Sequence, residues 1–107
     1  MTKSGADAIL SDDMALDDQI LRLRESGRSY LAIAERLGLE RATVARSRYL
    51  RALARLSPEV QSASRLRELQ RLDSLANHIA ARDDLDGPEI ARRLRLVDLL
   101  RFDLPEQ

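Results

Sequence analysis

The chain contains no cysteine, only one histidine and very few aromatic residues, and it has no long hydrophobic run. Without cysteine, neither disulfide bonds nor thiolate ligands for a metal are available. No apolar stretch approaches the length that a membrane span requires, and the N-terminus lacks the hydrophobic region of a signal peptide. We therefore expect a cytoplasmic protein that does not contact a membrane.

The residues that catalysis commonly uses are also scarce. His78 stands alone within a predicted helix, with no serine motif or glycine-rich loop beside it. Asp83, Asp84 and Asp86 lack the spacing, the internal glycine and the terminal glutamate of a calcium-binding loop, so capping of a turn is the simpler interpretation. With no nucleophile–base pair in the sequence, we expect a protein that is not an enzyme and has no cofactor or metal.

What the chain does contain favours helices. Of its 107 residues, 44% are apolar and 34% are charged, and leucine, alanine, arginine and glutamate dominate. No segment alternates apolar and polar residues in the way that a strand requires. The predicted fold class is all-α.

Glycine and proline divide this helical chain. We expect a flexible acidic tail over residues 1–15, a helix-turn-helix domain for DNA binding over 16–56, and a two-helix hairpin for oligomerisation over 57–104. The break between the last two is Ser57-Pro58, a serine that can cap a helix followed by a proline that suits its first turn.

The segment Tyr30–Tyr49 has the layout of a helix-turn-helix. This motif needs a small residue where its helices cross, a glycine in the turn, an apolar plug after it, and an inward apolar residue early in the second helix. Ala34, Gly38, Leu39 and Val44 meet these four needs in order. A helical hairpin without a DNA role would bury the same inward residues, but it would not need basic side chains at the start of its second helix.

The second helix of this motif departs from the usual pattern. Ser47 and Arg48 are polar where another inward apolar residue is expected, and an apolar stripe resumes at Tyr49. We infer that the stripe shifts around the helix and that its C-terminal half packs on a different partner. Tyr49 itself is expected in the core.

Two groups of side chains are predicted to contact DNA. Residues at the exposed start of the second helix would face base edges, where arginine bonds guanine and a methyl group contacts thymine. Residues before the first helix and later in the second would contact phosphates, although a solvated surface is the alternative for each arginine. The predicted base contacts are Arg41, Ala42, Thr43, Ala45 and Arg46. The predicted phosphate contacts are Arg28, Ser29, Tyr30, Arg48 and Arg51.

The charge distribution supports this assignment, although the net charge of the whole chain is zero. Residues 28–56 carry seven arginines against two glutamates, which gives this segment a local charge of +5. Phosphate contacts require such a concentration of positive charge.

The C-terminal half carries more leucine than one partner helix would cover. We therefore predict that this half mediates self-association, as a dimer or a ring. The residues assigned to that role are Leu66, Leu69, Leu72, Ile79, Leu94, Leu96, Val97, Leu99 and Leu100.

Three segments in this order carry a family resemblance: SYLAIAERLGLERATV, then RLRELQRLDSL, then IARRLRLVDLLRFDL. The chain resembles small helix-turn-helix proteins of bacteriophages and prophages, including small terminase subunits with a homeodomain-like N-terminal domain. The resemblance implies recognition of phage DNA in a bacterial or phage-infected cell and delivery to a large terminase motor subunit. The alternative interpretation is a dimeric transcriptional regulator of a phage or mobile element. A third interpretation is an interaction module without DNA binding.

Overall fold

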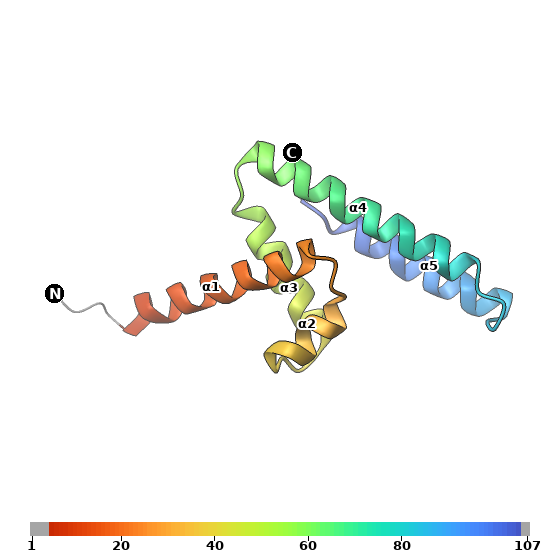
Figure 1. The fold of residues 1–107 in the computed structure, drawn as a ribbon, viewed down its shortest axis with the longest axis horizontal. Coiled ribbons are helices and arrows are strands. Elements are labelled where there is room, and N and C mark those ends of the chain that lie inside the picture. The colour runs from red at the N-terminus through yellow and green to blue at the C-terminus, as the bar shows by residue number, and fades with distance from the viewer. Residues whose placement is uncertain (1–4, 106–107) are drawn as a thin grey trace. The chain divides into compact units, whose positions relative to one another are not determined.

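The computed structural model describes residues 5–105, with side chains from residue 12 onward, and these residues form five helices and no strand (Figure 1). The predicted all-α class is confirmed. The helices are α1 (Gly5–Glu25), α2 (Tyr30–Leu37), α3 (Ala42–Ala54), α4 (Pro58–Ala80) and α5 (Gly87–Phe102). The chain divides into two compact units, unit 1 over residues 1–57 and unit 2 over 58–107.

Helix α1 begins earlier than the sequence pattern suggested. The flexible tail was expected over residues 1–15, but α1 starts at Gly5, so this prediction is wrong for residues 5–15. Residues 1–4 lie outside the part that the structure describes. The segment has no sustained apolar period, but it also has no proline, and its alanine, leucine and methionine residues favour the helix.

The turn between α1 and α2 is built on a glycine and a serine cap. Gly27 adopts a φ of 99°, a left-handed conformation that costs glycine least. Ser29 is the N-cap of α2, and its side-chain oxygen accepts a hydrogen bond from the backbone N–H of Ala32 at 3.1 Å. The start of α2 is therefore fixed by local interactions.

The turn between α2 and α3 is built on Gly38, as predicted. Its φ of 69° and ψ of 29° are left-handed, and its N–H donates to the carbonyl of Ala34. The N–H of Leu39 donates to the same carbonyl at 2.9 Å, which completes a glycine C-cap. Arg41 then takes an extended conformation at the N-cap position, and α3 begins at Ala42.

The core of unit 1 forms where α3 packs against both α1 and α2. The largest apolar side chains with essentially no exposure are Ile20 of α1, Ile33 of α2, and Tyr49 and Leu53 of α3. The Tyr49 ring lies 5.8 Å from that of Tyr30, with the planes tilted by 60°, a favourable geometry for an aromatic pair. The prediction that Tyr49 lies in the core is confirmed.

The buried stripe of α3 runs one residue later than predicted. Val44, assigned to the interior, is partly exposed, whereas Ala45 is completely buried. From Ala45 the stripe continues through Tyr49, Ala52 and Leu53, all essentially buried, so it does not shift around the helix. The polar residues at 47 and 48 therefore do not interrupt this stripe, because they were never part of it.

Unit 2 consists of α4 and α5, which pack on each other along their lengths (Figure 1). Asp86 is the N-cap of α5, and its carboxylate accepts from the N–H of Glu89 at 2.8 Å. The residues of this unit that are buried and apolar are Leu72, Ile79, Val97 and Leu104. Across the helices described between residues 5 and 102, none has both the length and the apolar character needed to cross a membrane.

Candidate functional site

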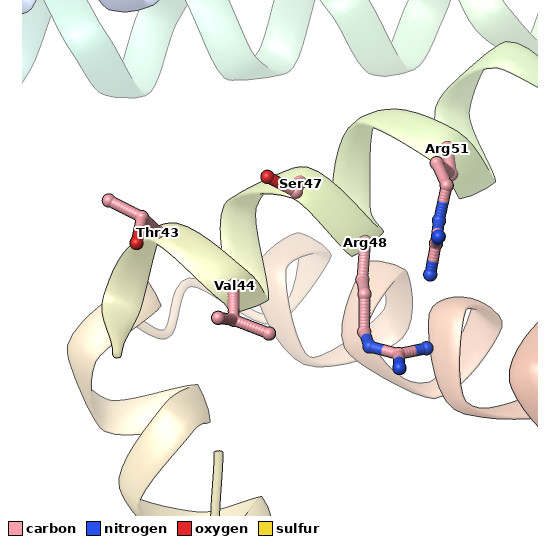
Figure 2. Close-up of a pocket in the computed structure, with 5 residues that line it drawn as sticks. All are labelled: Thr43, Val44, Ser47, Arg48 and Arg51. Atoms are coloured by element: carbon pink, nitrogen blue, oxygen red, sulfur yellow. The ribbon is translucent and has the colours of Figure 1, made fainter. Parts of the chain in front are cut away.

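The solvent-facing side of α3 is polar and slightly hollowed. Thr43 and Ser47 are exposed, and they line a shallow hollow together with Val44, Arg48 and Arg51. Figure 2 shows that Thr43 and Ser47 project from one side of α3, whereas the two arginines extend toward the side on which α1 packs. Small hydroxyl side chains on an exposed helix face leave room for another molecule to approach the backbone closely.

The predicted base-contacting residues do not all lie on this face. Thr43 and Arg41 are exposed, and Ala42 and Arg46 are partly exposed. Ala45 is 0% exposed, so its inclusion was wrong. Ala45 precedes Tyr49 by one helical turn and shares its inward direction, so its methyl group is packed inside unit 1.

Ser47 and the exposed edge of Val44 were not among the predicted contacts. Both follow from the correct helical phase, because Thr43, Ser47 and Arg51 are each separated by four residues and so share one face. This four-residue spacing is visible in the sequence, but it identifies the exposed face only when Ala45 is taken as the inward residue. Alanine gives little hydrophobic contrast, so the neighbouring valine was the stronger candidate.

Two arginines of α3 and Arg55, the C-cap of that helix, converge on one carboxylate of α1. Asp17 accepts from Arg48 at 3.1 Å and from Arg51 at 3.1 Å through Oδ1, and from Arg55 at 3.2 Å through Oδ2. Only 3% of the Asp17 side chain is exposed. Asp13 and Asp18 add an ion pair each, to Arg48 at 3.5 Å and to Arg55 at 3.2 Å. We call Asp17 and its three arginines the Asp17 cluster.

Two opposing effects act on the pKa of Asp17. Burial disfavours the charged form and raises the pKa, whereas the hydrogen bonds from Arg51, Arg48 and Arg55 lower it. The hydrogen bonds prevail, and the pKa lies below its usual value of 3.8. Asp17 is therefore ionised at neutral pH, and it fixes the direction of two side chains on α3 and one at its C-cap.

The ion pairs of the Asp17 cluster reduce the positive charge that residues 28–56 can offer to DNA. Three of the seven arginines in residues 28–56 are paired with carboxylates of α1, so the +5 that the sequence suggested is partly neutralised. Phosphate contact by Arg48 and Arg51 stays a prediction. Arg51 is the better placed of the two, because 55% of its side chain is exposed against 21% for Arg48. One bond to Asp17 still leaves Arg51 other N–H donors.

The other predicted phosphate contacts lie at the start of α2. Arg28 and Ser29 are exposed, while Tyr30 is half-buried. The Arg24 guanidinium lies 4.0 Å from the Tyr30 ring centroid, and its Nη1 donates to the carbonyl of Arg28 at 3.0 Å. This contact holds the turn before α2 in place, so that the exposed side chains at its end have a defined position.

The acidic turn of unit 2 has the capping role that was expected. The Arg82 Nε donates to Asp84 at 2.8 Å, and Asp86 caps α5. Among the residues with described side chains, no group of three or more histidine, aspartate or glutamate residues is placed to hold a metal ion.

The residues predicted for self-association fall into three groups. Leu72, Ile79 and Val97 are buried in the single chain, so including them was wrong: a partner would not reach them. Partly buried positions are Leu69, Leu94 and Leu100. Exposed positions are Leu66, Leu96 and Leu99. Phe102, which was not among the predicted residues, is 89% exposed.

Comparison of the chain with protein-family models, with curated proteins and with solved structures finds no match in any of the three.

Proposed function

We propose that unit 1 is a helix-turn-helix domain that binds double-stranded DNA, with the exposed face of α3 in the major groove. The observation that carries the proposal is the two-sided character of α3. Its inner side, from Ala45 to Leu53, is buried, and its outer side presents Thr43, Ser47 and Arg51. Insertion into the major groove requires a helix that packs on its own domain with one side and exposes polar side chains on the other.

The surroundings of α3 supply the contacts that such a domain needs. Arg41 lies exposed at the start of the helix, and Arg28 and Ser29 lie exposed at the start of α2. In helix-turn-helix proteins the recognition helix contacts bases near its N-terminus, and the preceding helix crosses the backbone. We assign base contacts to Thr43 and Ser47, and phosphate contacts to Arg28 and the exposed part of Arg51.

In this proposal the Asp17 cluster prepares α3 for DNA rather than competing with it. A mobile arginine loses conformational entropy when it meets a phosphate, whereas Arg51 is already oriented by its bond to Asp17. Nothing in the proposal requires a catalytic step, and the chain is assigned a binding role alone.

Two biological settings fit a DNA-binding chain of this kind. DNA packaging, as in a small terminase subunit, requires a ring and a large motor subunit as partner. Transcriptional regulation requires a dimer, whose symmetry matches a palindromic site. The exposed Leu96 and Leu99 favour a self-associating chain in either case. Native mass spectrometry of the intact protein distinguishes the two by subunit number.

The binding proposal is tested by fluorescence anisotropy with a short mixed-sequence duplex, titrated at low and then at moderate salt. We expect binding that weakens steeply as salt increases, because phosphate contacts release counterions. Arg28→Ala should lower the slope of log affinity against log salt by about one. The absence of binding at low salt would overturn the proposal.

A pair of charge variants tests the assigned face. Ser47→Glu places a carboxylate on the exposed side of α3, and we expect it to weaken DNA binding by more than about tenfold through repulsion of phosphates. Gln19→Glu adds the same charge at an exposed position of α1 and should change the affinity little. If both variants weaken binding equally, only net charge matters and α3 is not the contact surface.

A further inference from the structure

The outer side of α5 carries a stripe of apolar side chains that no other described part of unit 2 covers. Leu96, Leu99 and Phe102 are 48%, 61% and 89% exposed. Their spacing of three residues places them on one side of the helix over about 9 Å. We call these three residues the α5 stripe.

The stripe is not a by-product of the packing between α4 and α5. Val97 is 2% exposed, and Ile90, Leu94 and Leu100 are partly buried, so α5 already has an inner apolar side. An isolated exposed leucine needs no explanation, but three large apolar side chains in a row on a second side indicate a contact surface.

The charges beside the stripe indicate what covers it. Arg95 and Asp103 are exposed, and each lies four residues from Leu99, one on either side in the sequence. If a second copy of α5 packs antiparallel with the two Leu99 side chains at the symmetry axis, Arg95 of each copy lies opposite Asp103 of the other. The same operation places Phe102 opposite Leu96.

A parallel arrangement lacks this complementarity. It would set Arg95 against Arg95 and Asp103 against Asp103, and like charges at such close range disfavour the contact. Both arrangements have the two-fold symmetry of most homodimers, in which each copy contributes the same surface, so the charges decide between them.

We propose that the α5 stripe is a homodimer interface, in which two copies of α5 pack antiparallel about Leu99 and exchange Arg95–Asp103 ion pairs. The partner is a second copy of this chain. Three apolar side chains from each copy form a small interface compared with the roughly 1,200–2,000 Å² of stable complexes. The dimer should therefore be weak and depend on protein concentration. This proposal does not depend on DNA binding by unit 1.

Analytical ultracentrifugation of the intact chain without DNA tests the proposal. We expect a monomer–dimer equilibrium for the wild type and at least a tenfold larger dissociation constant for Leu99→Glu, which places two carboxylates at the axis. Leu31→Glu is the matched control, since Leu31 is 59% exposed on α2, in the other unit, and the dimer should persist. Circular dichroism verifies that both variants keep their helices.

Charge reversal tests the antiparallel pairing. Arg95→Asp and Asp103→Arg should each weaken the dimer, because each creates like-charge pairs across the axis. The double variant inverts both pairs and should restore the wild-type equilibrium. A wild-type chain that stays monomeric at every concentration would overturn the proposal. So would a dimer that Leu99→Glu leaves intact, a ring of more than two subunits, or a double variant that is not restored.

Discussion

The two units place their apolar side chains differently. In unit 1, Ile20, Ile33, Tyr49 and Leu53 are fully buried, and the outer face of α3 is polar. In unit 2, the α5 stripe is exposed although α4 and α5 already pack on each other. Three helices enclose a core from several sides, whereas two helices cover only the sides that face each other.

This difference suggests different kinds of partner. A surface with hydroxyl and guanidinium groups over a closed core suits a polar, charged ligand such as DNA. A row of exposed leucine and phenylalanine side chains suits a protein surface of the same character. The proposals for unit 1 and unit 2 are therefore independent, and the experiments below test the contrast between the closed core and the exposed stripe.

The largest effect should come from opening the core of unit 1. Leu53 is 0% exposed, and we expect Leu53→Ala to lower the free energy of unfolding by about 2–5 kcal/mol, through lost burial and the cavity left behind. Leu99→Ala removes the same atoms from an exposed site and should cost less than about 0.5 kcal/mol in the monomer. Urea denaturation at low protein concentration measures both, and equal costs would contradict the contrast between the units.

The next largest loss of stability is expected from substitution of Asp17 in the Asp17 cluster. Asp17→Asn keeps the shape but removes the charge that three arginines share. We expect a loss of roughly 3 kcal/mol, the lower end of the range for breaking a buried ion pair, because the three arginines are partly exposed to water. Asp18→Asn changes a carboxylate that is 50% exposed and should cost less than about 1 kcal/mol. A cost for Asp17→Asn no larger than that for Asp18→Asn would show that the cluster does not stabilise unit 1.

The same carboxylate predicts a dependence on pH. Because the pKa of Asp17 is lower in the folded chain than its usual 3.8, the unfolded chain takes up the proton first as the pH falls. The stabilisation by Asp17 is complete above the usual pKa and is lost as the pH decreases through the folded value. We expect the urea midpoint of the wild type to fall more steeply below about pH 4 than that of Asp17→Asn. Parallel curves would contradict this.

A smaller effect is expected at the turn between α2 and α3. Gly38 has a φ of 69°, and a Cβ added there would meet nothing within 4 Å, so strain of the backbone is the main cost. Gly38→Ala should destabilise unit 1 by about 1 kcal/mol. Gly38→Asn should cost less, because asparagine tolerates this conformation better. Thermal unfolding measures the two, and the reverse order would argue against strain as the cause.

Local features of the fold could be predicted from sequence because their causes are local. Ser29, Gly38 and Asp86 act where capping and turn chemistry place them. The start of α1 was missed because an irregular apolar pattern does not by itself prevent a helix. The predicted phase of α3 was wrong by one residue, because Val44 is more hydrophobic than Ala45 and was therefore the stronger candidate for the interior.

The tertiary contacts of the candidate site could not be predicted from the sequence to the same extent. Asp17 and Arg48 are 31 residues apart in the chain, and only the packing of α1 on α3 brings them together. The sequence therefore indicated a concentration of arginines but not their partners. Phe102 was missed because it follows the leucines near the end of α5, and only its 89% exposure shows that it extends the stripe.

The most direct test of the account is amide chemical-shift mapping of the intact protein during a titration with duplex DNA. We predict that the signals of Thr43, Ser47 and Arg51 move together with those of Arg28 and Ser29, while the α5 stripe is unaffected. Changes confined to unit 2, or no change at low salt, would contradict the assignment of DNA binding to the outer face of α3.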